Sequence, residues 1–220
     1  MAINLSVFAA PLSFNYKWAA KNQIITLTGM SGSGKTYLKD RLMQDYHFAE
    51  IVSTTTRPKR QGEREGVDYY FISEDDFKEN IKEGRMMEFT CFQGNYYGVS
   101  RQELLEKSNL GMPLLLITEP SGVVSTKAFA KDNKIELTSF FLDITPEDAI
   151  DRVLKRENNA SGANKSREKS IQGEEQKWCE MLEYDIMIPY FNEHNEAEVV
   201  KQIVDQFDPE PKGTFFAQFN

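Results

Sequence analysis

The sequence predicts an α/β fold in which helices cover both faces of a mainly parallel β-sheet, giving three layers. Three short apolar segments have the length and unbroken hydrophobicity of buried parallel strands: residues 24–28, 114–117 and 137–142. A segment of helical character follows each strand, at residues 36–46, 121–131 and 146–156. Strands that alternate with helices in this order form a parallel sheet, because each helix returns the chain across one face.

The rest of the chain divides into a lobe, a final strand and helix, and two ends. Residues 53–111 mix short extended pieces, at 68–72 and 86–90, with helices capped by Ser73 and Ser100. We interpret this stretch as an inserted α+β lobe within a core formed by residues 22–52 and 112–207. The core ends with a polar break at 158–164, a helix leading to residue 183, a strand at 184–188 and a helix at 196–207. Residues 1–20 form an N-terminal extension, in which residues 14–18 could add an edge strand, and residues 208–220 form a tail.

The segment between the first strand and the first helix has the pattern of a phosphate-binding loop. Residues 29–36 read GMSGSGKT, which is G-x-x-x-x-G-K-T in the strand–loop–helix context that such a loop requires. Its backbone N–H groups and the helix N-terminus favour an anionic triphosphate, and Thr36 offers a hydroxyl ligand for Mg²⁺. The residues expected to bind ATP are Ser31, Gly32, Ser33, Gly34, Lys35 and Thr36.

The net charge, the apolar segments and the cysteines of the chain limit the kinds of partner and the cellular location that we expect. The net charge of −8 argues against a nucleic-acid polymer as the partner, and no apolar run is long enough to span a membrane. The N-terminus lacks the basic region of a signal peptide, and the two cysteines, Cys91 and Cys179, favour a reducing cytoplasm.

A second group of residues is suited to holding a phosphorylated acceptor. Arg57 and Arg60 are three residues apart and can clamp one phosphate through paired, charge-assisted hydrogen bonds. Tyr69 and Tyr97 can direct hydroxyl groups to the same phosphate. Glu88 can accept the adjacent N1–H and N2–H donors of guanine, a donor pair that adenine lacks.

These residues lie in motifs that resemble those of guanylate kinase, a family that transfers the ATP γ-phosphoryl group to GMP or dGMP. Residues 53–60 read STTTRPKR, residues 62–69 read GEREGVDY, and Glu88 precedes GNYYG at 94–98. The resemblance covers nearly the whole chain from residue 24 to residue 207. It implies a kinase core with a parallel sheet, an inserted monophosphate-binding lobe and a short lid at residues 157–168.

The resemblance also implies a role for individual residues. Those expected to bind the monophosphate are Ser53, Arg57, Arg60, Tyr69, Glu88, Tyr97 and Glu119. Those expected to take part in phosphoryl transfer are Lys35, Arg57, Arg152, Arg156 and Arg167. Arg152 and Arg156 lie four apart on one helix, and Arg167 follows eleven residues later, as the family pattern has it. The implied partners are ATP with Mg²⁺ and a GMP-like acceptor, for a monomer or a homodimer.

Two positions depart from the family pattern. Val99 stands where a Ser or Thr hydroxyl usually reaches guanine O6, and Ile117 replaces the first of two acids, of which Glu119 retains the second. An acceptor preference shifted toward a deoxy or modified nucleotide therefore stays open. So do a kinase of the same fold for another phosphorylated acceptor, such as a ribosyl bisphosphate, and a non-catalytic guanylate-kinase-like module that binds a protein.

Overall fold

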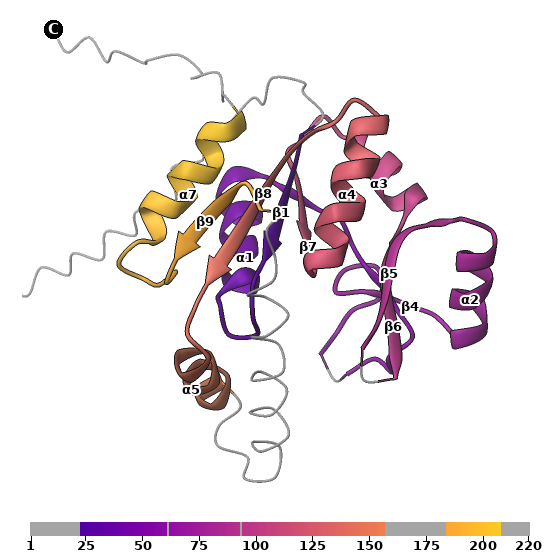
Figure 1. Ribbon diagram of the computed structural model, residues 1–220, viewed down its shortest axis with the longest axis horizontal. Helices are drawn as coiled ribbons and strands as arrows, with labels where there is room; N and C mark the ends of the chain where they lie inside the picture. Colours follow the sequence, from indigo (N-terminus) through magenta and orange to yellow (C-terminus); the bar gives the residue numbers. More distant parts are fainter. Residues whose placement is uncertain (1–22, 61, 93, 157–183, 208–220) are drawn as a thin grey trace, which may run out of the picture.

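The core of the molecule is a five-stranded parallel sheet (Figure 1). The computed structural model describes residues 23–60, 62–92, 94–156 and 184–207. In spatial order the strands are β2 (Ala49–Glu50), β7 (Leu114–Ile117), β1 (Gln23–Thr28), β8 (Glu136–Asp143) and β9 (Ile186–Pro189). Every neighbouring pair is parallel, so the predicted sheet type is confirmed.

Apolar side chains of β1 alternate between two clusters on opposite faces of the sheet. Ile25 and Leu27 pack with α1 (Lys35–Tyr46) and α7 (Glu196–Val204), which the short 3₁₀ helix η1 (Asp205–Phe207) extends. Ile24 packs on the other side with α4 (Pro120–Asp132) and α3 (Arg101–Ser108). The period-2 geometry of a strand thus places a helical layer on each face.

Helix α5 (Pro146–Arg156) lies at the end of the sheet where β1 and β8 finish (Figure 1). Its N-terminus is capped by Thr145, whose Oγ1 accepts a hydrogen bond from the Asp148 N–H at 3.2 Å. Ala149 and Val153 are buried against Met30 of the loop that follows β1. This contact holds α5 next to that loop.

Residues 53–111 build a second, four-stranded sheet beside the core (Figure 1). Its strands, in spatial order, are β4 (Tyr70–Phe71), β3 (Thr54–Thr55), β6 (Asn95–Ser100) and β5 (Met86–Phe92). β5 and β6 form an antiparallel hairpin, and α2 (Glu74–Lys82) packs against β6 through the stacked rings of Phe77 and Tyr96. The α+β character of this stretch agrees with the prediction, whereas β6 is a strand that the sequence did not indicate.

Both predicted serine caps are present. Ser73 Oγ accepts from the Asp76 N–H at 3.1 Å, and Ser100 Oγ accepts from the Glu103 N–H at 3.0 Å. The predicted helix at 196–207 is α-helical to Val204 and then tightens into η1. The extension at 1–20, the lid at 157–168, the helix leading to residue 183 and the tail at 208–220 lie outside the described residues. Among the described helices, none is long and apolar enough to cross a membrane.

Candidate active site

The loop after β1 wraps tightly between the sheet and α5. Gly32 and Gly34 have φ values of 87° and 99°, in the region that favours glycine. A Cβ on Gly32 would lie 2.6 Å from the Ala149 carbonyl oxygen, and one on Gly34 would lie 2.6 Å from Cδ1 of Phe191. Both glycines are therefore required by conformation and by space, which explains the glycine spacing of the motif.

Lys35 is the first residue of α1, and its side chain folds back over this loop. The Lys35 Nζ donates hydrogen bonds to the carbonyl oxygens of Gly29 at 2.6 Å and Met30 at 2.8 Å. Ser33 is buried, and its Oγ lies 3.4 Å from the same nitrogen. The loop thus fixes a positive charge at the N-terminus of a helix, where a phosphate chain is stabilised.

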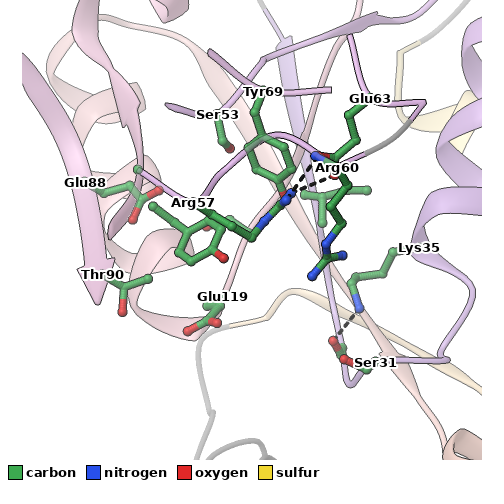
Figure 2. A pocket seen from close by; sticks show the side chains of 15 residues that line it. Ser31, Lys35, Ser53, Arg57, Arg60, Glu63, Tyr69, Glu88, Thr90 and Glu119 are labelled. Atoms are coloured by element: carbon green, nitrogen blue, oxygen red, sulfur yellow. Dashed lines mark hydrogen bonds and ion pairs between the residues drawn. The ribbon is translucent and has the colours of Figure 1, made fainter. Parts of the chain in front are cut away.

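A cavity of about 360 Å³ extends from this loop to the inner side of the lobe. The loop contributes Gly29, Ser31 and Lys35 to its lining, and the end of β7 with the turn that follows contributes Ile117, Thr118 and Glu119. The lobe contributes Ser53, Arg57, Arg60, Glu63, Tyr69, Glu88, Thr90, Tyr97 and Gly98. Figure 2 shows the two arginines between Lys35 at one end and Glu88 at the other.

Arg57 is held at the centre of the cavity by Glu63. Its Nη1 and Nη2 donate to the two Glu63 carboxylate oxygens at 3.1 and 2.7 Å, and the guanidinium lies over the Tyr69 ring, 5.5 Å from its centroid. Glu63 also accepts the backbone N–H of Arg60 at 2.7 Å. This pairing lowers the pKa of Glu63 and raises that of Arg57, so both groups are ionised. The carboxylate therefore fixes the orientation of the arginine fork.

Tyr69 and Tyr97 meet edge to face beside this arginine, with ring centroids 6.1 Å apart. Burial raises the pKa of Tyr69, and the neighbouring Tyr97 adds to the effect, so its hydroxyl stays a donor at neutral pH. The side chain of Arg60 is exposed and reaches the same cavity. Two cations and two phenol hydroxyls thus surround one space, which suits a dianionic phosphate.

Glu88 on β5 lies at the opposite end of the cavity from Lys35 (Figure 2). Burial, with the carboxylate of Glu119 nearby, raises the pKa of Glu88 to about 7. A carboxyl that is partly shielded from water and lies near a second carboxylate is costly to ionise. Such a group is typical of a site that binds a ligand offering hydrogen-bond donors.

The comparison with known proteins agrees with this geometry. Residues 21–206 match the family described as guanylate kinase. The chain belongs to the guanylate kinase family. It is 32% identical over 187 residues to the guanylate kinase of Streptococcus mutans, covering 83% of this chain and 85% of that protein. The guanylate kinase of Streptococcus pyogenes is equally similar, at 32% identity over 187 residues, with 83% and 84% covered.

A solved structure shows the same fold. The crystal structure of guanylate kinase from Anaplasma phagocytophilum matches with a TM-score of 0.60 and 23% sequence identity, and 90% of each chain is covered. The α/β architecture expected from the sequence is thereby confirmed.

The structure brings most, but not all, of the expected site residues together. Arg152 on α5 contacts the phosphate loop, with Nη1 3.3 Å from the Gly32 carbonyl oxygen and Cζ 5.0 Å from the Tyr190 ring centroid. Gly32, Ser33, Gly34 and Thr36 form the loop and the start of α1 without lining the cavity described above. Arg156 ends α5, but its side chain, like the whole of Arg167, lies outside the described residues.

The two departures from the family pattern have different surroundings. Val99 is fully buried in the apolar cluster that contains Leu104 and Leu116. Ile117 lines the cavity and also packs against the cluster that contains Leu27. Val99 thus belongs to the apolar core and does not line the cavity, whereas Ile117 places an aliphatic group on the cavity wall.

Three side chains that line the cavity were missed by the sequence reasoning, which assigned no role to Glu63, Thr90 or Thr118. Glu63 stands in the GEREGVDY motif, and its partnership with Arg57 depends on a loop that the sequence does not specify. Thr90 is two residues after Glu88 on a strand, so the period-2 rule was a signal for it.

Proposed function

We propose that this chain transfers the γ-phosphoryl group of ATP to GMP or dGMP, yielding ADP and the nucleoside diphosphate. An oxygen of the acceptor phosphate attacks the γ-phosphorus, and the bond from that phosphorus to the β–γ bridging oxygen breaks, so that ADP leaves. The observation that supports this proposal best is the continuous cavity that joins Lys35, the Arg57–Arg60 pair and Glu88. An acceptor bound in this space would have its phosphate beside the loop that holds the donor triphosphate.

Each residue has a proposed role in this reaction. The phosphate loop and Lys35 hold the triphosphate, and Arg57, Arg60, Tyr69 and Tyr97 hold the acceptor phosphate in line with it. Glu88 and Ser53 bind the guanine base, with Glu119 beside them. Arg152, Arg156 and Arg167 neutralise charge on the migrating group. The division into core, lobe and lid belongs to this proposal, with the lid excluding water during transfer.

Mg²⁺ is part of the proposal, and the residues present suit a metal that arrives with ATP. Among the described residues, no group of three or more His, Cys, Asp or Glu side chains could hold a metal ion. Mg²⁺ commonly binds through substrate phosphates, water and one or two protein oxygens. The Thr36 hydroxyl, exposed at the start of α1, supplies such an oxygen. When bound, the ion neutralises charge on the β- and γ-phosphates.

An ADP-release assay with a panel of nucleoside monophosphates tests the proposed function. GMP and dGMP should be the best acceptors, and a Lys35→Met variant should be inactive with every acceptor while still folded. If both guanine nucleotides are poor acceptors and another base works well, the assignment of the acceptor is wrong. If no acceptor gives ADP, the protein is a non-catalytic binding module.

Ile117 favours one refinement, which the same panel tests. An aliphatic side chain at this point of the lining cannot hydrogen-bond a sugar hydroxyl, so a deoxy acceptor loses less there than a ribonucleotide. A higher kcat/KM for dGMP than for GMP would support this second candidate, and equal values would contradict it.

A further inference from the structure

Strand β5 supplies two side chains to the cavity wall, Glu88 and Thr90 (Figure 2). They are two residues apart on an extended strand, so they lie on the same face of the lobe's sheet. Thr90 is paired with Tyr97 across the β5–β6 ladder, and Tyr97 also lines the cavity. The alternation of the strand therefore directs Thr90 toward the space that Glu88 faces.

The neighbouring strand β6 offers an apolar side chain at this point. Val99 is paired with Glu88 and is fully buried among apolar residues. The next hydroxyl, that of Ser100, accepts the Glu103 N–H at 3.0 Å and caps α3. Among the described residues that the lobe contributes to the cavity, the aliphatic hydroxyls are those of Ser53 and Thr90.

In Figure 2 the side chains of Ser53 and Thr90 are drawn on opposite sides of Glu88. The matching edge of guanine presents O6, then N1–H, then the 2-amino group. A carboxylate that accepts N1–H and one amino hydrogen leaves O6 at one side and the second amino hydrogen at the other. A hydroxyl on each side of Glu88 can satisfy both.

The position of Thr90 along the strand decides which group it meets. Thr90 is level with Tyr97, which stands beside Arg57 and Tyr69 at the place proposed for the acceptor phosphate. Ser53 is level with Glu88, because the next residue, Thr54, pairs with Gly98, whereas Thr90 lies further along β5, on the side of Glu88 toward Tyr97. The 2-amino group lies on the sugar-side edge of guanine, whereas O6 lies on the other edge.

We propose that Thr90 is a specificity-determining residue for the acceptor base, with its hydroxyl accepting a hydrogen bond from the 2-amino group of guanine. This inference rests on the proposed function, because it takes a guanine nucleotide as the acceptor. It moves part of the base recognition from β6, where Val99 has no hydrogen-bonding group, to β5.

The test compares GMP with IMP, which differs from GMP only by lacking the 2-amino group. In a Thr90→Val variant, kcat/KM for GMP should fall about threefold to tenfold, mainly through KM, because one hydrogen bond distant from the reacting phosphates is lost. The value for IMP should stay at the wild-type level. Thr90→Ser keeps the hydroxyl and should restore discrimination, whereas Thr90→Ala should behave like the valine variant.

Dissociation constants for GMP and IMP, measured by competition, should show the same pattern as the kinetics. The inference would be overturned if the valine and alanine variants lost affinity for GMP and IMP equally. It would also be overturned if they lost affinity for neither nucleotide. These outcomes are distinct from failure of the proposed function, which would appear as absence of GMP phosphorylation by the unaltered protein. Thermal unfolding of each variant separates a loss of fold from a loss of recognition.

Discussion

Replacement of Glu88 by Gln gives the sharpest test of the cavity's electrostatics. Burial and Glu119 raise the pKa of Glu88 from the ordinary 4.5 to about 7, so the folded protein disfavours the ionised side chain. Glutamine has nearly the same shape and no charge. The substitution therefore removes the penalty for ionisation while leaving the packing of β5 in place.

The sign and size of the effect follow from proton linkage. Below about pH 4.5 Glu88 is neutral in both the folded and the unfolded protein, and its stability contribution is complete. As the pH rises from 4.5 to about 7, the unfolded chain loses the proton first, so the free energy of unfolding falls. Above about pH 7 the loss levels off at up to about 3 kcal/mol. The Glu88→Gln variant lacks this loss.

Urea unfolding of both proteins between pH 5 and pH 8 measures the difference. The variant should gain stability relative to the wild type as the pH rises toward 7, and the difference should level off above that pH. GMP binding by the variant should be weakened far more than ATP binding, because only the base contact is altered. A stability difference that is flat with pH, or equal weakening for both nucleotides, would refute the reasoning.

Three further predictions test the Arg57–Glu63 pair, the phosphate loop and the N-terminal cap of α3. Arg57→Lys should raise the KM for GMP at least tenfold, as measured by initial rates, because an ammonium cannot replace the planar two-pronged donor. Gly34→Ala should destabilise the protein more than the control Gly84→Ala in thermal unfolding. Both glycines have positive φ, but only at Gly34 would the new Cβ meet Phe191. Ser100→Ala should cost about 1 kcal/mol of unfolding free energy in urea, through loss of the α3 cap; an unchanged midpoint would contradict the cap's role.

The strands and helices of the core could largely be predicted, because the sequence patterns that identify them span only a few neighbouring residues. Residues 114–117 were expected to be a strand and are β7, and the expected strand at 24–28 is β1 with one added residue. Apolar side chains with no polar interruption suit strands covered on both faces, so periodicity and length identify them. The helix caps at Ser73 and Ser100 were likewise predicted, since a capping hydroxyl and the N–H it accepts are three residues apart.

The lobe was less predictable because its strands are short and their pairing is not local. β3 is only two residues long, and it pairs with β6 some forty residues later. β6 contains Gly98, which has a low strand propensity but is needed there, because a Cβ would lie 2.4 Å from the Glu88 carbonyl oxygen. The need for glycine at this position arises from packing between neighbouring strands. The strand propensities of individual residues therefore cannot predict it.

The sequence by itself determined the chemistry available to the protein: a phosphate loop ending in Lys35, paired arginines at 57 and 60, and an acid at 88. Each of these groups could be recognised from the sequence because it is defined by the types of its residues and by short spacings between them. Only the tertiary structure decided that these groups share one cavity, that Glu63 orients Arg57, and that Val99 turns into the core while Thr90 faces the site. The reason is physical: contacts between segments far apart in the chain form only when packing of the two sheets sets their positions.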